Sequence, residues 1–527
     1  MFNYIQKVIR YRKMTSSGGS GAKESPEAPK ESSDELSEDL EANIQLIQGI
    51  IVESNDLNIR RFVIGKKVKA AIIYIDGLVD KTLVNETILK PLMYHSEMDS
   101  PPETVDIDYV ESELLFVGGI DSKQKVNEAV NKILSGDTVF LMDGAAKALI
   151  IALRGWKMRG IEEPETEATV RGPREGFTET LRINTSMIRR KIKNPNLKFE
   201  TLTVGDRTKT DVCIAYITDL AKPELIEEVK RRLNKIKTEA VLESGYIEQY
   251  IEDAPYSIFA TVGNSEKPDK VAAKLLDGRV AIIIDGTPFV LTVPCVFIES
   301  FQSPEDYYSR FAFTSALRMI RFTAFFISIL APAIYVALST FHQELIPTQL
   351  ILSMAAAHEG VPFPSLVEAT IMLLFFEILR EAGVRLPRPI GQAVSIVGAL
   401  VIGEAAVTAG LIGAPMVIVI AVTAVSSFTI PAQLDSGTII RIVLLILAGF
   451  LGGFGIAIGM FALLIHMVNL ESFGTPYLMP IAPFDKSGLK DSFIRAPLWT
   501  MLKRPKGMSM DDVKQKKPSG PPPFNEN

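Results

Sequence analysis

The sequence of 527 residues is poor in the residue types that disulfide-linked domains and metal sites require. It has two cysteines, Cys213 and Cys295, which excludes a disulfide scaffold. It has four histidines and no HExxH, CxxC or other zinc-type spacing. It also lacks a Walker loop and a GxGxxG motif. We therefore expect no enzymatic activity, no cofactor and no metal site.

Charged residues are scarce in one long block. Between Phe322 and Leu470, 149 residues carry only 11 Asp, Glu, Lys or Arg side chains. No lysine occurs between Lys274 and Lys486. This block rules out a purely soluble protein, because long uncharged apolar runs are typical of membrane helices. The net charge of -6 argues against nucleic-acid binding.

The first half of the chain has a different composition, which predicts a different kind of structure. Residues 1–40 are expected to form a disordered N-terminal segment, since 15–38 are rich in Ser, Gly, Glu and Pro. Alternating strand and helix patterns then predict two cytoplasmic α/β subdomains, at 41–170 and 171–300. The expected strands are Lys69–Ile75, Thr138–Met142, Ala148–Leu153, Val212–Thr218 and Val280–Ile284, and the expected helices are Ser122–Leu134, Pro223–Lys237 and Lys267–Leu276. Asp143-Gly144 is expected to turn a hairpin between two strands.

The fold class expected for the whole chain is therefore an α/β cytoplasmic region followed by an α-helical multi-pass membrane domain at 301–470. About five or six spans are expected, including a possible re-entrant segment. Ile346–Ala357 is too short to cross a bilayer, which favours an interfacial or re-entrant position. The expected full spans are Phe322–Phe341, Phe363–Leu379, Ile390–Ile412 and Pro415–Pro431.

Thr438–Leu470 leaves two topologies open. It has 33 residues and one charge, Arg441, so a straight helix would be about 50 Å long, against about 30 Å of hydrocarbon. Basic residues precede the first span and fill the tail at 471–527, which places both on the cytoplasmic side and requires an even number of crossings. A tight pair of crossings or a re-entrant element satisfies this rule, whereas one long tilted helix does not. The end of the tail is expected to be disordered.

Carboxylates and glycines within the membrane block are the candidate pore or packing residues. Glu404 lies deep in its span, where a carboxylate either lines an aqueous path or is held by a neighbouring helix. Glu368 is either a vestibule charge or a structural one. The candidate close-packing stripe consists of Gly449, Gly453, Gly455 and Gly459, which equally could break the helix.

Other polar residues have simpler interpretations. Glu377 is expected at the cytoplasmic boundary, and Arg441 is expected to extend its guanidinium to the membrane surface. His342 and His358 flank an outer loop, where solvated histidines are commoner than a pH sensor. The turn Arg171–Glu179 either holds an anion or connects two domains, and the second interpretation is favoured.

Several segments resemble the A subunit of spore germinant receptors, the GerA (GerABKA) family, over about residues 45–505. They are FLMDGAAKALII, RGPREGFTETLRINTSMIRRKI, DVCIAYITDL, VAIIIDGTPFVLTVPCVF, SPEDYYSRF and AAAHEGVPFPSLVEATIMLLFFEILREAGVRLPRPIGQAVSIVGALVIGEAAVTAG. The resemblance implies a spore inner membrane protein, partnered by a permease-like B subunit that binds the nutrient and by a C lipoprotein. It also implies a homo-oligomeric ring, expected to be a pentamer, that acts as a germinant-gated ion channel.

Two alternatives stay open on the residues alone. A secondary transporter would show inverted repeats, and no internal repeat is visible in the sequence. A membrane-anchored scaffold would need fewer polar residues in its spans than this block carries.

Overall fold

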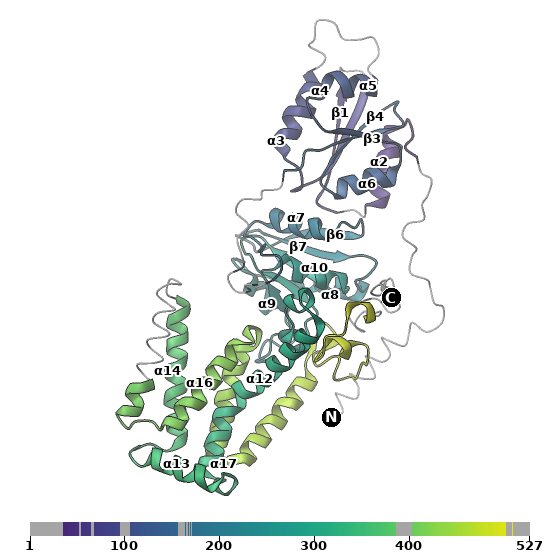
Figure 1. The fold of residues 1–527 in the computed structure, drawn as a ribbon. Coiled ribbons are helices and arrows are strands. Elements are labelled where there is room, and N and C mark those ends of the chain that lie inside the picture. The colour runs from purple at the N-terminus through teal and green to yellow at the C-terminus, as the bar shows by residue number, and fades with distance from the viewer. Residues whose placement is uncertain are drawn as a thin grey trace, which may run out of the picture.

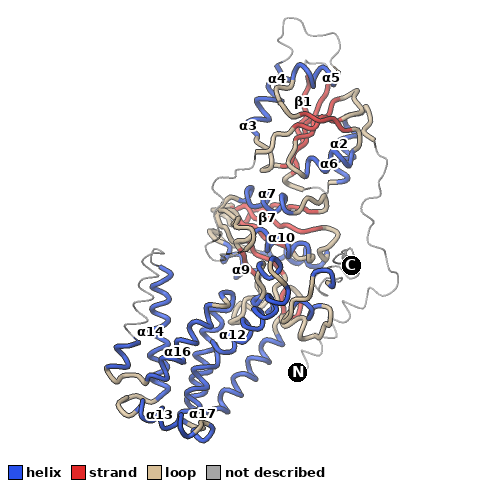
Figure 2. The backbone as a smooth tube through the Cα atoms, in the orientation of Figure 1, coloured by secondary structure: helices blue, strands red, loops and turns tan. Residues whose placement is uncertain are grey.

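The computed structural model describes residues 35–51, 54–64, 68–94, 106–155, 164, 167, 169, 171–385, 403–501 and 509. Two α/β units and a helical bundle follow one another along the molecule (Figures 1 and 2). Nearly all of the predicted disordered N-terminal segment, the end of the tail and most of the predicted span Ile390–Ile412 lie outside the described residues. The limits expected for the subdomains stay predictions.

Each α/β unit contains a five-stranded sheet whose neighbouring strands all pair antiparallel. The first sheet has the order β1-β2-β4-β5-β3 and the second β6-β7-β9-β10-β8. The strands are β1 Leu57–Ile64, β2 Val68–Ile75, β3 Ile120–Lys123, β4 Thr138–Met142, β5 Ala148–Ile151, β6 Leu197–Val204, β7 Thr210–Ile217, β8 Gly263–Ser265, β9 Val280–Ile284 and β10 Val290–Val293. All five predicted strands are confirmed within two residues at each end. The predicted helix at Ser122 starts later, at Val126, because β3 takes the first residues.

Apolar side chains on both faces of each sheet are covered by helices. One face of the first sheet packs against α2 and α6, and the other against short helical turns from α3 to α5. The second sheet packs against α7 and α10 on one face and α8 and α9 on the other. The helices are α2 Leu40–Ile50, α3 Lys81–Leu83, α4 Lys90–Tyr94, α5 Ile107–Tyr109, α6 Val126–Leu134, α7 Leu181–Lys191, α8 Pro223–Lys235, α9 Ser244–Ile251 and α10 Pro268–Leu276.

The two units are structural repeats of each other, which the sequence analysis missed. Besides the shared strand order, each unit has an asparagine whose side chain forms hydrogen bonds with the backbone of the residue six positions before it. Asn43 accepts a hydrogen bond from Ser37 N (2.8 Å) and donates one to Ser37 O (2.6 Å). Asn184 does the same with Thr178 N (2.8 Å) and Thr178 O (2.5 Å). These hydrogen bonds fix the backbone just before α2 and just before α7, at equivalent positions in the two units.

The Asp-Gly turns of the two units are equivalent as well. Asp143-Gly144 joins β4 to β5, which confirms the predicted hairpin turn, and Asp285-Gly286 joins β9 to β10. In both turns the aspartate accepts a hydrogen bond from the first residue of the neighbouring helix, Leu40 N or Leu181 N. Both glycines have φ near +90°, a region that favours glycine. Both units contain an Asp-Gly pair between two strands and an asparagine near the start of a helix. This shared pattern is the sequence signal from which the repeat could have been predicted.

A buried ion pair joins the two units. Arg189 on α7 reaches across to Asp56, with Nε and Nη2 each 3.0 Å from a carboxylate oxygen. Its side chain is fully buried, and that of Asp56 nearly so. Arg189 Nη1 also donates to the carbonyl of Leu197 (3.0 Å). A paired and fully hydrogen-bonded guanidinium of this kind fixes the geometry between units.

The helical bundle follows the second unit (Figure 1). Its elements are α11 Glu305–Tyr308, α12 Phe311–Thr340, α13 Thr348–His358, α14 Ser365–Arg385, a helical stretch at 403–408, α16 Ala414–Phe428 and α17 Leu434–Asn469. Two segments, Phe311–Thr340 and Pro431–Asn469, are long and apolar enough to cross a membrane. The helix α12 begins eleven residues before the predicted span Phe322–Phe341, because its first turns are held by ion pairs: Arg318 pairs with Asp306 and Asp491, and Arg321 with Asp306.

The helix α17 is broken into a tight hairpin. Gly452 has φ 59° and ψ -142°, which is not helical. A Cβ added to Gly459 would lie 2.6 Å from Leu444 Cδ2, although residues fifteen apart in one helix lie about 22 Å apart. The chain therefore reverses at Gly452, and the straight long helix considered for this segment is excluded.

Both ends of the hairpin are attached to the second α/β unit. Gln433 Nε2, just before α17, donates to Ser300 Oγ (2.7 Å). After the second limb, Ser472 Oγ donates to Thr261 O (2.6 Å), and the two-stranded ribbon of β11 Glu471–Ser472 and β12 Thr475–Pro476 follows. The turn at Gly452 therefore lies at the far end of the bundle, away from the α/β units.

Candidate functional site in the helical bundle

A chain of polar groups, with a fully buried carboxylate at its centre, crosses the far end of the bundle. Glu368, in the first turn of α14, is fully buried. Its Oε2 accepts a hydrogen bond from Gly413 N (2.8 Å), and its Oε1 lies 3.2 Å from His358 Nδ1. His358 Nε2 is in turn 3.1 Å from the Tyr335 hydroxyl. The chain links α12, α13, α14 and α16 within an otherwise apolar packing.

Local sequence explains why this carboxylate is tolerated there. Gly413 is the N-cap of α16, whose fifteen residues begin with Ala414 and Pro415. The free N–H groups and the positive end of the helix dipole at this terminus favour a carboxylate. Glu368 is therefore held inside the bundle by the Gly413 N–H and the nearby His358 imidazole, and this burial favours the structural interpretation over the vestibule charge. His358, for which a solvated position was favoured, is partly buried: its side chain is 24% exposed and contacts both Glu368 and Tyr335.

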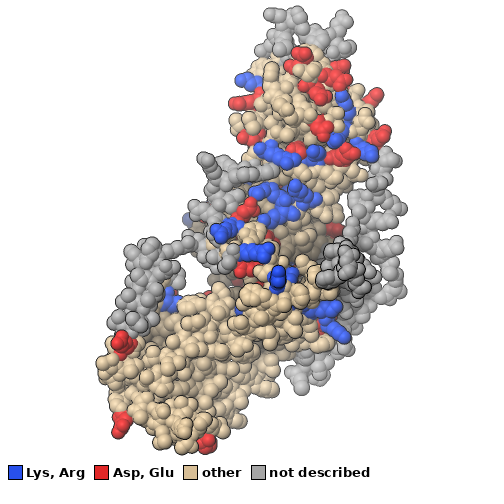
Figure 3. Space-filling view, viewed as in Figure 1, with Lys and Arg blue, Asp and Glu red and all other residues tan. Residues whose placement is uncertain are grey.

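Glu404 is in a different environment. It lies in the helical stretch 403–408 and its side chain is exposed on the bundle surface, whereas its neighbour Ala406 is buried. Within the described part of the chain no residue forms an ion pair with this carboxylate. Charged side chains cover the α/β units but are nearly absent from the visible face of the bundle (Figure 3). An exposed carboxylate on an apolar helix surface requires water or a second chain beside it when that surface is in a membrane.

The four candidate glycines all lie where another group approaches closely. A Cβ at Gly449 would meet Leu366 of α14 at 2.5 Å, and one at Gly455 would meet Leu447 O across the hairpin at 2.2 Å. A Cβ at Gly459 would lie 2.6 Å from Leu444 Cδ2, as described above. Gly453 N donates to His342 Nε2 (3.1 Å). The break in α17 is at Gly452, which is not one of the four candidates. The contacts of the four candidates favour the close-packing role over the helix-breaking one.

The hairpin predicts a disulfide that a continuous helix forbids. A chain carrying Leu444→Cys and Gly459→Cys is expected to form an intrachain disulfide under mild oxidation, because the Leu444 side chain reaches the position that a Cβ at residue 459 would occupy. The bond is read by mass spectrometry of the protease-digested chain. The matched control pairs Leu444→Cys with Phe461→Cys, since Phe461 is 65% exposed and points outward. Equal crosslinking of both pairs would contradict the hairpin.

Arg441 does not extend to the membrane surface, so that expectation is wrong. Its side chain is 1% exposed and its Nε donates to Ser328 O of α12 (2.8 Å). Its Nη1 lies 3.5 Å from Glu377 Oε1, and Glu377 pairs with Arg380 at 2.7 Å. The first limb of α17 packs so closely on α12 that the guanidinium has no route outward. After the chain at Glu368, this cluster is the second group of polar residues inside the bundle, and it lies near the α/β units.

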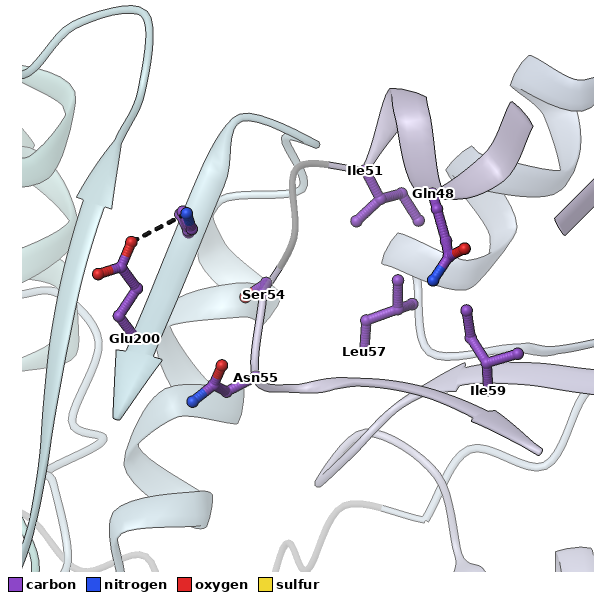
Figure 4. Close-up of a pocket in the computed structure, with 8 residues that line it drawn as sticks. Gln48, Ile51, Ser54, Asn55, Leu57, Ile59 and Glu200 are labelled. Atoms are coloured by element: carbon purple, nitrogen blue, oxygen red, sulfur yellow. Dashed lines mark ion pairs between the residues drawn. The ribbon is translucent and has the colours of Figure 1, made fainter. Parts of the chain in front are cut away.

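The two α/β units also enclose an opening between them. Its volume is about 360 Å³, and it is lined by Gln48, Ile51, Ser54, Asn55, Leu57, Ile59, Lys198 and Glu200 (Figure 4). Burial by itself would raise the pKa of Glu200, but hydrogen bonds from Lys230, Lys198 and Tyr216 lower it to about 2. The charged groups that line the opening are thus already paired with one another, which leaves the bundle as the stronger candidate site.

Comparisons with known proteins agree over nearly the whole chain. Residues 45–507 match the family described as Bacillus/Clostridium GerA spore germination protein. The chain is 46% identical to spore germination protein KA of Bacillus subtilis over 93% of this chain and 90% of that protein. It is 41% identical to spore germination protein GerLA of Bacillus cereus, over 87% of this chain and 93% of that protein.

A solved structure matches as well. It is the N-terminal domain of the A subunit of the Bacillus megaterium spore germinant receptor GerK3, at 33% identity. The match covers 50% of this chain and 98% of that one, with a TM-score of 0.40. On the family match and these relatives together, the chain belongs to the GerA family of spore germination proteins.

Proposed function

We propose that this chain is the A subunit of a nutrient germinant receptor, and that copies of it assemble into a ring whose helical bundles form a germinant-gated path for monovalent cations. The partners are a permease-like B subunit that binds the nutrient and a C lipoprotein. The ring is expected to be a pentamer in the spore inner membrane. Membership of the germination family supports the receptor role.

The exposed carboxylate of Glu404 is the observation that carries the channel proposal. A single copy leaves it on an apolar helix surface with no described partner. A ring of copies solves this problem by turning that surface toward a water-filled centre, where a ring of carboxylates attracts cations. Neither a lone anchor nor a scaffold gives such a residue a role.

The membrane topology follows from the helices and their charges. We infer crossings by α12, α14, the span Ile390–Ile412 predicted from the sequence, α16 and each limb of α17, which makes six. An even number returns the tail to the side of the α/β units. Arg310 and Arg321 in the first part of α12 and Arg385 at the same end of the bundle support a cytoplasmic position for this side.

Gating requires that nutrient binding favours an open over a closed arrangement of these helices. The break at Gly452 gives the bundle a place where two helical limbs change their angle without unwinding. The polar chain at Glu368, at the same end as Gly452, and the cluster at Arg441, near the α/β units, hold the helices together at the two ends of the bundle.

The proposal predicts that Glu404→Gln lowers germinant-triggered potassium release about tenfold or more, because the carboxylate ring loses its attraction for cations. The measurement uses the full chain reconstituted with both partner subunits in liposomes, with a potassium electrode. Glu344→Gln is the matched control, since that side chain is 72% exposed at the far end of the bundle. Unchanged release by an assembled Glu404→Gln complex would refute the channel.

A further inference from the structure

The turn in α17 is bound from outside the helix by one histidine. The backbone N–H of Gly453 donates a hydrogen bond to Nε2 of His342, at 3.1 Å. His342 lies two residues after the end of α12, at the far end of the bundle, where α13 and the turn of α17 also lie (Figure 1). Its side chain is 39% exposed, so the imidazole remains accessible to solvent while it makes this contact.

Two consecutive glycines make room for the imidazole. A Cβ added to Gly452 would lie 2.9 Å from Phe341 and 3.2 Å from His342 Nε2. A Cβ added to Gly453 would lie 3.1 Å from the same nitrogen. The residues that follow α12 therefore pack directly against the backbone of the turn, and a side chain at either glycine would press on the ring.

The bonded N–H lies at the start of a helix. Because Gly452 is not helical, the second limb of α17 begins directly after it, and the first N–H groups of that limb have no acceptor within it. The His342 ring supplies one such acceptor and so acts as an N-terminal cap. The positive end of the dipole of the limb lies at the same place, which favours a neutral group there over a cation.

This contact requires a neutral imidazole. A ring nitrogen accepts a hydrogen bond only through its lone pair, and both nitrogens of the protonated ring are donors. Protonation would therefore place a ring N–H against the N–H of Gly453 and a positive charge at the start of a helix. Imidazole is the side chain that ordinarily changes charge between pH 5 and 8, so mild acidity is enough to break a contact of this kind.

The charged groups around the ring leave its protonation to the solvent. On its own segment, Glu344 Oε1 lies 3.8 Å from the other ring nitrogen, but that carboxylate is 72% exposed and water screens it. The hairpin packed against the ring has no ionisable side chain between Arg441 and His466. Within the described residues, neither Glu359 after α13 nor the polar chain at Glu368 forms a hydrogen bond or ion pair with the ring.

We propose that His342 is a pH switch on the α17 hairpin. The neutral ring caps the second limb and joins the turn to the end of α12, and the protonated ring releases the turn. The inference rests on the proposed membrane placement only for the side from which protons arrive, which is the face opposite the α/β units. It goes beyond the proposed function by adding a signal that acts on the break at Gly452.

The test is amide hydrogen exchange of the full chain in detergent at about pH 8 and about pH 5.5, read by mass spectrometry and corrected for the intrinsic exchange rate at each pH. In the native chain, protection of the segment 450–456 is expected to fall about fivefold at the lower pH, which corresponds to the net contribution of one hydrogen bond. His342→Gln is expected to abolish this fall, because the amide oxygen of glutamine accepts a hydrogen bond at either pH. His466→Gln is the matched control and should keep the fall, since that histidine is in the last turn of α17.

An equal fall in His342→Gln would overturn the proposal, and so would loss of the fall in His466→Gln. An equal fall in the first limb, at residues 441–448, would also overturn it, because that result means general loosening of α17. His342→Leu removes the acceptor and should show low protection at both pH values, and full protection in this variant would contradict the switch. Potassium release is a separate measurement, so failure of the switch and failure of the channel are distinguishable.

Discussion

Asp56→Ala is expected to destabilise the pair of α/β units by about 3–5 kcal/mol, because it leaves the buried guanidinium of Arg189 without its counter-ion. The two groups share two contacts of 3.0 Å, and the arginine side chain has no exposed area. The measurement is chemical unfolding of the full chain in detergent, monitored by the transition of the α/β region.

A second substitution separates the ion pair from general damage. Arg189→Met in the Asp56→Ala background removes the unpaired charge, so much of the lost stability should return. Glu41→Ala is the matched control, since its ion pair with Arg61 is exposed and should not shift the transition measurably. A double variant less stable than Asp56→Ala would show that the arginine is held by something other than this aspartate.

Glu368→Ala is expected to destabilise the helical bundle by about 2–4 kcal/mol. The substitution removes the acceptor of the Gly413 N–H bond and the partner of His358 together, in a place without exposed area. Thermal unfolding of the purified chain in detergent reports the loss. Glu368→Gln keeps a carbonyl oxygen for Gly413 and a donor for the imidazole, so it should cost less than half as much.

The control for this prediction lies a few residues away. Glu359 is exposed in the loop after α13 and Glu359→Ala should be within about 0.5 kcal/mol of the native chain. Equal midpoints for Glu368→Ala and Glu359→Ala would mean that the polar chain adds nothing to the bundle. The proposed function predicts a further effect, since a loosened bundle should leak potassium without germinant.

The structural repeat formed by the two α/β units could not be predicted from hydrophobic patterns in the sequence. The two units share few identical residues, and the ones that match, such as Asn43 with Asn184 and Asp143 with Asp285, are polar residues at turns and helix starts. Their meaning depends on the hydrogen bonds they make to backbone groups, which hydrophobic periodicity does not report. The strands themselves were predictable, because buried apolar runs such as Val280–Ile284 have one ordinary interpretation.

The polar residues of the apolar helical region could likewise be predicted only in part. Their positions were evident from composition, since so few charges occur in the block. It was not evident from composition which of these residues have hydrogen-bond or ion-pair partners, because the partners come from other helices. Glu368 meets a histidine ten residues earlier and a backbone N–H forty-five residues later, whereas Glu404 has no described partner at all.

The sequence by itself determined the division into a charged α/β region and an apolar helical region, and most of the strands and helices. These properties depend on local patterning and on charge counts, which tertiary contacts do not alter. Only the tertiary structure decided that α17 is a hairpin, that Arg441 is buried and that Glu368 is paired. Each of these outcomes depends on which helix faces which, and that follows from close packing of side chains far apart in the chain.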